Sequence, residues 1–262
     1  MMAHGGWMLR NFGDELSQRI VAEVSGRRVR WAPPESAVIT AIGSVVEHVA
    51  GANGPGVIWG SGIRSPDSAP SGWANRRPAR FLAVRGVLTR DALGLDASTP
   101  LGDPGLIVRA VYPRSTRARG IVVIPHFLAF GSPDARRQMA VARSRGMRVM
   151  PPSAGYERIC EEVSGAELVL TSSLHGMVVA DALDRPVQLV SFGRTAEPSF
   201  KFADYQSVFG LSSTFVSLTD VLDGRIAEVS ESAAERSQNV TATIDDVVEA
   251  LARSGTPLAD LS

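Results

Sequence analysis

Residues 120–126 read GIVVIPH, residues 167–173 read ELVLTSS and residues 185–192 read RPVQLVSF, and these three runs decide the fold. Each run is short, apolar and rich in β-branched residues, which is typical of a buried parallel strand. Stretches with helical periodicity separate them, such as SPDARRQMAVARSRG (132–146). A last amphipathic stretch, residues 235–255, predicts a single closing helix. This alternation predicts an α/β fold with mainly parallel sheets and Rossmann-like connections.

The first part of the chain repeats the pattern more weakly. VIWGSG (57–62) and FLAVRG (81–86) read as further strands. The basic segment YPRSTRARG (112–120) has no apolar periodicity and is the best candidate for a linker. We therefore expect two Rossmann-like lobes, over residues 1–111 and 120–262, with a cleft between them.

Composition excludes several classes of protein. Basic and acidic residues are equal in number, 27 each, so no global field favours nucleic acid. The single cysteine, Cys160, allows neither an intramolecular disulfide nor a cysteine-based metal site, and no cluster has metal-ligand spacing. No signal-peptide pattern and no membrane-spanning run is evident, so we expect a cytoplasmic protein with at most peripheral membrane contact. Ser65 stands where a dinucleotide fingerprint needs glycine, and no P-loop occurs.

Two histidines follow strong β runs, at the carboxyl ends where open parallel sheets bind ligands. His126 ends GIVVIPH, and His175 begins the helix that follows ELVLTSS. The N–H groups of a helix N-terminus favour phosphate or carboxylate, which makes Gly176 a candidate contact. Ser172 and Ser173 add hydroxyl groups in the same turn. The alternative is a capping Ser/Thr cluster beside a histidine that only packs.

Three further residues are candidates for substrate contact. Arg85 lies near the end of the FLAVRG run and suits an anion, although an ordinary surface arginine is the alternative. Asn11 and Asp14 belong to NFGDE, before a helical stretch. Asp14 is either an N-cap or a partner for a substrate hydroxyl.

The ordered motifs resemble the polysaccharide pyruvyl transferase family over about residues 10–210. No single motif is highly specific. The ordered set of motifs is considerably stronger evidence for the family than any one motif. In chain order the motifs are NFGDE, WGSG, AVRGVLTRDALG, GDPGL, IPH, TSSLHGMVVADALDRPVQLV and KFADYQSVFG.

The resemblance implies two lobes of the GT-B type with phosphoenolpyruvate, the co-substrate, bound in the cleft and no other cofactor. His175 matches the family's catalytic histidine, and Arg85 and His126 match family positions. Through the WGSG and KFADYQSVFG motifs, the resemblance adds Gly60, Ser61 and Lys201 as candidates for substrate binding.

One departure concerns the donor site. Many family members carry arginine two residues before the late histidine, where this chain has Ser173. Serine cannot form a bidentate ion pair with an anion, so Arg194 or Lys201 compensates, or the donor binds differently.

The expected partners are phosphoenolpyruvate and a sugar or lipid-linked glycan, with a ketal or an enol ether as product. Two other functions stay open: a glycosyltransferase that uses a nucleotide sugar, and a non-catalytic protein that binds glycans or assembles a complex.

Overall fold

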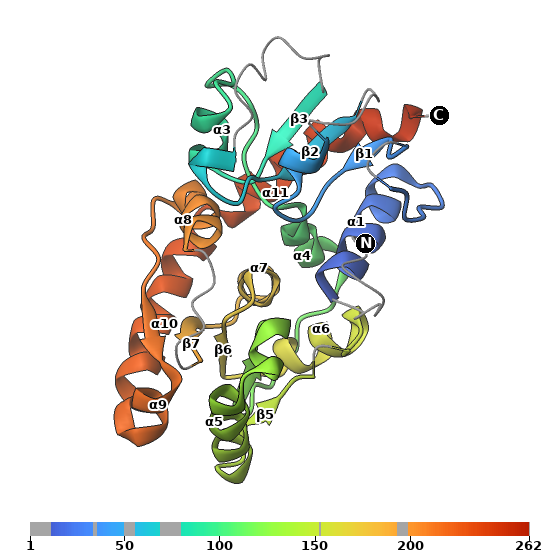
Figure 1. Cartoon of the computed structure of the whole chain (residues 1–262). Coiled ribbons are helices and arrows are strands. Elements are labelled where there is room, and N and C mark those ends of the chain that lie inside the picture. The colour runs from blue at the N-terminus through green and yellow to red at the C-terminus, as the bar shows by residue number, and fades with distance from the viewer. Residues whose placement is uncertain are drawn as a thin grey trace.

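The computed structural model describes residues 12–33, 36–49, 56–68, 80–151, 153–192 and 199–261 as a mixed α/β protein with two parallel sheets (Figure 1). The first sheet has the strand order β1-β2-β3. Both of its strand pairs are parallel, which confirms the two strands expected in this part of the chain. Its strands are β1 (Ile39–Thr40), β2 (Val57–Ser61) and β3 (Arg80–Val84).

The second sheet reverses its strand order. From β4 the chain adds β5 on one side, then crosses to the other side of β4 and adds β6, β7 and β8 in turn, all parallel. This reversal makes the gap beyond the ends of β4 and β6 a topological switch point, the usual ligand site of an open α/β sheet. The strands are β4 (Ile121–Ile124), β5 (Arg148–Val149), β6 (Leu168–Thr171), β7 (Val187–Ser191) and β8 (Phe215–Ser217).

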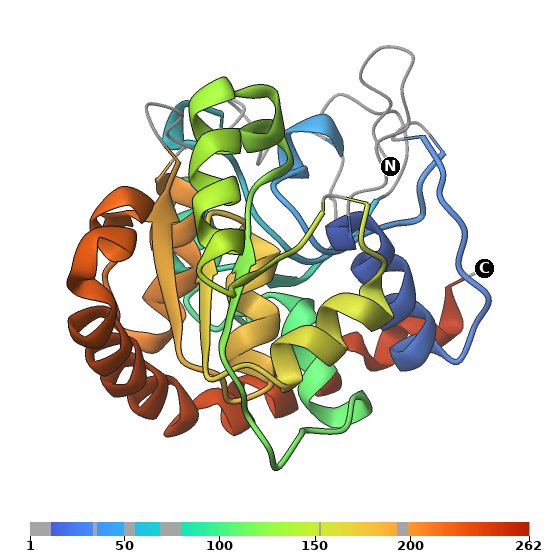
Figure 2. The ribbon, with the colours of Figure 1, turned by 90° about the horizontal axis from the view of Figure 1, so that it is seen from below.

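Helices connect and cover the strands, as expected for an α/β fold. In α5, the Ser132 hydroxyl accepts a hydrogen bond from the backbone N–H of Ala135 and Pro133 occupies the first turn, which confirms the predicted cap. Seen from below, α5 crosses the front of the molecule (Figure 2). The α-helices are α1 (Phe12–Ser25), α2 (Val46–Val49), α3 (Val87–Ala92), α4 (Val108–Val111), α5 (Pro133–Ser144), α6 (Tyr156–Ser164), α7 (Leu174–Ala182), α8 (Phe200–Gln206), α9 (Leu218–Asp220), α10 (Ile226–Thr241) and α11 (Ile244–Gly255).

Alternation along the strands builds a layered core. Val122 and Ile124 point to one face of the second sheet and Val123 to the other. The first of these layers continues to Trp59 of the first sheet, so one hydrophobic core is shared by both sheets. The parallel α/β class is confirmed. The division into lobes of residues 1–111 and 120–262 stays a prediction.

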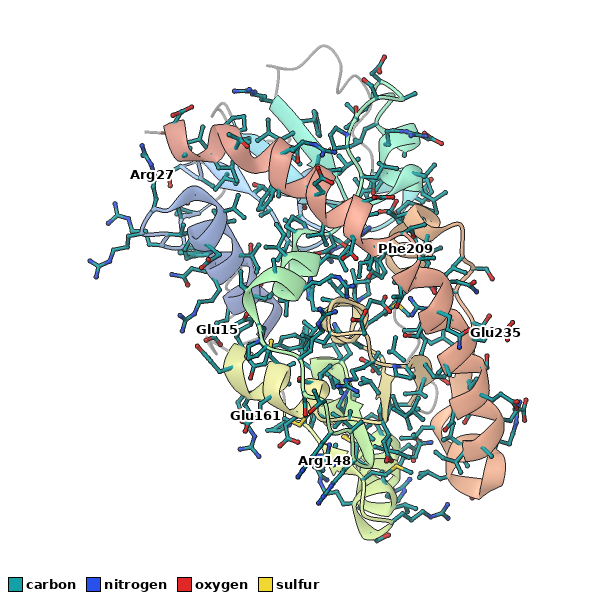
Figure 3. The ribbon with its side chains drawn as sticks, turned by 180° about the vertical axis from the view of Figure 1, so that it is seen from behind. Glu15, Arg27, Arg148, Glu161, Phe209 and Glu235 are labelled. Atoms are coloured by element: carbon teal, nitrogen blue, oxygen red, sulfur yellow. The ribbon has the colours of Figure 1, made fainter. Side chains whose placement is uncertain are left out.

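The expected single closing helix over residues 235–255 is wrong in detail. The stretch contains the end of α10 and the whole of α11, which meet at Ala242–Thr243 (Figure 3). Since α10 packs on β7 of the second sheet and α11 on β2 and β3 of the first, a straight helix would not cover both. Trp59 fixes the second contact, because its indole N–H donates to the Leu251 carbonyl.

A buried ion pair joins the first sheet to α8. Arg85, just after β3, donates through Nε to the Asp204 carboxylate at 2.8 Å, and both side chains are 0% exposed. Asp204 also accepts from the backbone N–H and the hydroxyl of Thr89, at 2.7 and 2.6 Å. Gly86 permits this approach, because a Cβ there would lie 1.8 Å from the Asp204 carbonyl oxygen. The pair therefore fixes where α8 sits.

Removing one charge of this pair should destabilise the fold strongly. Asp204→Asn leaves the Arg85 cation buried without its counterion, so we expect the free energy of unfolding to fall by about 3–5 kcal/mol. The matched control is Glu249→Gln, which breaks the exposed Arg253–Glu249 pair on α11 and should cost less than about 0.5 kcal/mol. Urea unfolding measures both variants, and equal losses would contradict a structural role for the buried pair.

Candidate functional site

The carboxyl ends of β4 and β6 bring His126 and the serine turn together. Ile124 of β4 pairs with Thr171 of β6, so the residues that follow both strands emerge side by side. The Ser172 hydroxyl then accepts a hydrogen bond from the backbone N–H of His126 at 2.8 Å. His126 itself begins the short helix η4 (Phe127–Gly131), and its ring stacks on Phe127 with centroids 4.3 Å apart.

His175 lies in the first turn of α7 with its imidazole wedged against α1. A Cβ on Gly13 would lie 2.2 Å from Nδ1, and the Phe12 ring meets the imidazole edge to face with centroids 6.2 Å apart. The Nε2 atom is buried and has no hydrogen-bond partner among the described residues. Buried polar atoms are nearly always paired, so an unpaired imidazole nitrogen makes His175 a candidate for contact with a ligand.

Burial and surrounding positive charge determine the protonation state of His175. Loss of solvent lowers its pKa to about 3, and the charges of Lys201, Arg85 and His126 lower it in the same direction. The imidazole is therefore neutral at neutral pH, in a region of positive potential. An anion bound here would offset those charges and raise this pKa. The arrangement suits a negatively charged ligand and a proton transfer at one atom.

Lys201, one of the charges near His175, lies in the first turn of α8. Its ammonium is 5.2 Å from the centre of the Phe202 ring. It is the only lysine of the chain, although basic residues number 27. Every other basic residue that is not histidine is arginine, so the composition alone singles out Lys201. The motif KFADYQSVFG singles out the same residue.

The structure places Arg85 in the interior, so the alternative of an ordinary surface arginine is wrong. Its guanidinium donates to Asp204, to the Ser44 hydroxyl and to the Ile63 carbonyl. Its influence on His175 is electrostatic, and direct contact with a ligand stays a prediction. The position of Arg85 in the FLAVRG run indicated the right region but not this burial.

Asp103 is a buried acid that sequence reasoning missed. Oδ1 accepts from the Gly105 backbone N–H at 2.8 Å, while Oδ2 has no partner among the described residues. Burial raises the pKa of Asp103 to about 6, against the opposing effects of Gly105 and Arg85. The sequence feature that could have indicated it is the motif GDPGL, in which Asp103 caps a 3-10 helix.

The hydroxyl groups at the end of β6 and in the turn after it form hydrogen bonds with backbone groups. Thr171 Oγ1 donates to the Ile124 carbonyl at 2.8 Å, and Ser173 Oγ caps α7 by accepting from the Gly176 N–H at 3.4 Å. Gly176 is packed so closely that a Cβ would lie 2.5 Å from Thr171 Oγ1. Ser173 is therefore a helix cap, which confirms that part of the alternative interpretation and leaves the role of His175 untested. A role of Ser172, Ser173 or Gly176 in ligand binding stays a prediction.

The remaining predicted site residues are not shown to lie beside His175. Gly60 has φ +76° and packs on Pro104, and the Ser61 hydroxyl donates to the Gly43 carbonyl at 2.8 Å, so both shape the first sheet. Asp14 is exposed on α1. Asn11 and Arg194 lie outside the described residues. Within the described part of the chain, no group of three or more His, Cys, Asp or Glu side chains has the arrangement of a metal site.

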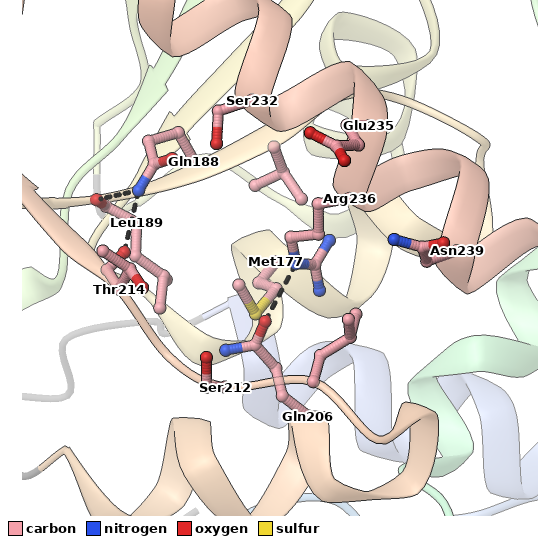
Figure 4. Close-up of a pocket in the computed structure, with 12 residues that line it drawn as sticks. Met177, Gln188, Leu189, Gln206, Ser212, Thr214, Ser232, Glu235, Arg236 and Asn239 are labelled. Carbon is pink, nitrogen blue, oxygen red and sulfur yellow. Dashed lines mark hydrogen bonds between the residues drawn. The ribbon is translucent and has the colours of Figure 1, made fainter.

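A pocket of about 210 Å³ lies between β7, α8 and α10 (Figure 4). None of the predicted site residues lines it. Its arginine, Arg236, makes two hydrogen bonds to Asp181 at 2.7 and 2.9 Å and one to Gln206 at 2.9 Å. This charge is thus already neutralised inside the fold, and we place the candidate site at His175.

No family model matches the chain. The succinoglycan biosynthesis protein ExoV of Rhizobium meliloti (strain 1021) is 26% identical over 163 residues, which is 59% of this chain and 46% of the relative. The uncharacterized protein L143 of Acanthamoeba polyphaga mimivirus is 27% identical over 124 residues, 44% of this chain and 42% of the relative. The chain spans less than half the length of these curated relatives.

Among solved structures, the spinosyn rhamnosyltransferase SpnG complexed with thymidine diphosphate covers 73% of this chain and 50% of its own, at 17% identity. The TM-score is 0.26, a likeness too weak to bear on fold or function.

The low pKa of His175 should appear in the pH dependence of stability. Between pH 3 and 6.5, the native imidazole is neutral while the unfolded one is protonated. The unfolded chain then binds more protons, so the free energy of unfolding rises with pH, by about 1.4 kcal/mol per unit for one proton. Asp103 acts oppositely between pH 3.8 and 6, since its native carboxyl keeps the proton.

His175→Asn isolates the histidine contribution, because the variant keeps Asp103. Urea unfolding from about pH 4 to pH 6 should show wild type gaining stability with pH more steeply than the variant, by up to about 1.4 kcal/mol per unit. Parallel curves would mean that His175 titrates normally in the native protein.

Proposed function

We propose that this chain is a two-lobed pyruvyl transferase that moves a pyruvyl group from phosphoenolpyruvate onto hydroxyls of a sugar or glycan. The observation that carries the proposal is the buried Nε2 of His175, which has no partner among the described residues and lies among cationic groups at the switch point of the second sheet. Phosphoenolpyruvate carries a carboxylate and a phosphate, and both need positive charge and N–H donors. The similarity to a succinoglycan biosynthesis protein supports a role in polysaccharide biosynthesis.

Lys201 takes the part that many family members give to an arginine at the position of Ser173. Ser173 is committed to the cap of α7, where its hydroxyl accepts from Gly176. Lys201 instead approaches from α8 and is held there by the Arg85–Asp204 pair three residues later. An ammonium group is a compact point charge that suits one anionic group of the donor, without the bidentate geometry of arginine.

The proposed mechanism begins with a proton. When the anionic donor binds, it raises the pKa of His175, which takes up a proton at Nε2. His175 gives this proton to the methylene carbon, and C2 becomes oxocarbenium-like. A sugar hydroxyl adds to C2 and its proton returns to the imidazole. The C2–O bond to phosphate then breaks as the imidazolium gives its proton to the leaving phosphate, and a second hydroxyl closes a cyclic ketal while its proton returns to the imidazole. Such acid–base catalysis contributes on the order of 100- to 10,000-fold.

Two other functions predict different ligands. A glycosyltransferase would bind a nucleotide sugar, and fold alone does not separate it from a pyruvyl transferase. A non-catalytic glycan-binding or assembly protein would bind neither donor. The neutral imidazole among positive charges favours a transferase with an anionic donor, because a protein that only binds glycans gains nothing from it.

The single lysine offers a direct test of the donor. Pyridoxal phosphate with borohydride labels primary amines. In this chain these are the side chain of Lys201 and the N-terminal amine. Phosphoenolpyruvate should protect Lys201 from labelling and leave the N-terminal amine as the internal control, measured by peptide mass spectrometry. A ligand at about 100 times its Kd should also stabilise wild type by about 2.7 kcal/mol, with a smaller effect in Lys201→Met.

Each alternative has its own result in the same experiment. Protection by UDP- or GDP-sugars, with none by phosphoenolpyruvate, would assign a glycosyltransferase. No protection and no thermal shift with any of these ligands would leave the non-catalytic function.

A further inference from the structure

The segment after His126 forms an exposed surface that the proposed reaction does not use. This surface, the α5 face, comprises η4 and the outer side of α5. Leu128 is 57% exposed, Val141 42% and Phe127 36%, which makes these three among the most exposed large apolar residues described. Met139 and Ala142 point inward to the core, so the helix is already anchored to the sheet by its other side.

Positive charge is concentrated in the same segment of the chain. Residues 126–148 contain five arginines and one acidic residue, Asp134, whereas the whole chain is balanced. Arg136, Arg143 and Arg145 are exposed, and within the described residues no carboxylate lies within ion-pair distance of them. The other two arginines of the segment are paired, Arg137 with Asp134 and Arg148 with Glu162.

We infer that the α5 face binds the surface of an anionic phospholipid membrane. Arginine side chains near such a surface each gain about 1 kcal/mol from the negative lipid headgroups, and apolar side chains gain by entering the headgroup boundary. Exposed leucine and valine side chains in the same segment as the arginines fit a membrane better than a nucleic acid, which offers phosphates and base edges but no apolar layer. In the described part of the chain no helix is long and apolar enough to cross a bilayer, so this contact is peripheral.

The location gives the contact a consequence for the site. η4 begins at His126, whose backbone N–H is bonded to Ser172 in the turn before His175. Helix α5 lies at the front of the view in Figure 2 and is reached from β4 through this short helix. The η4 end of this face lies next to the carboxyl end of β4, where a membrane-borne acceptor would be presented, and α5 runs back from there toward the start of β5. The binding itself does not depend on the donor proposed above.

Sedimentation with vesicles tests the inference on the full chain. We expect binding to vesicles of phosphatidylcholine mixed with phosphatidylglycerol, weakening as salt is added, and little binding to phosphatidylcholine alone. Arg143→Gln with Arg145→Gln should weaken binding on the order of 30-fold, since each arginine contributes about fivefold. Leu128→Ser should weaken it several-fold without changing the charge.

The matched control is Arg19→Gln with Arg253→Gln, which removes the same charge from exposed positions on α1 and α11. This control should bind almost as wild type does. Circular dichroism and melting of each variant exclude unfolding as the cause. No binding of wild type to anionic vesicles, or equal losses in the two double variants, would overturn the inference. So would tighter binding to an oligonucleotide with the same dependence on Arg143 and Arg145.

Discussion

The buried pair between Arg85 and Asp204 is the constraint on which the candidate site depends. Two charges with no exposure to water are tolerated because each is hydrogen-bonded on several sides: Asp204 by Arg85 and both donors of Thr89, and Arg85 also by Ser44. This network spans from the end of β3 to α8, two elements more than a hundred residues apart in sequence. Since Lys201 is on the same helix as Asp204, the pair also sets the distance of the lysine from His175.

The chemistry follows from that arrangement. Burial lowers the pKa of His175, and the charges of Lys201, Arg85 and His126 lower it further. The fold therefore holds a neutral imidazole whose Nε2 has no hydrogen-bond partner in the described part of the chain. An unpaired buried polar group costs about 1–3 kcal/mol. Such a cost is typical of a site whose ligand supplies both the missing hydrogen bond and the missing negative charge.

Much of the fold could be predicted from the sequence, because buried parallel strands and capped helices are local patterns. GIVVIPH and ELVLTSS are strands, and Ser132 and Ser173 cap the helices that follow. The break between α10 and α11 could not be predicted, because it depends on how the two helices pack against two different sheets. The same is true of Arg85, whose partner Asp204 lies 119 residues away. Asp103 was missed because an Asp-Pro turn is an ordinary sequence feature. The fixed place of His175 against Gly13 depends on α1 packing, which no local pattern reports.

The central claim is that an anion binds beside His175 and raises its pKa. Calorimetric titration with phosphoenolpyruvate, near pH 6 and in buffers of different ionisation enthalpy, measures the protons taken up on binding. The account predicts that wild type takes up more protons than His175→Asn, by up to about one per site. Equal proton uptake in the two proteins, with phosphoenolpyruvate bound in both, would contradict it.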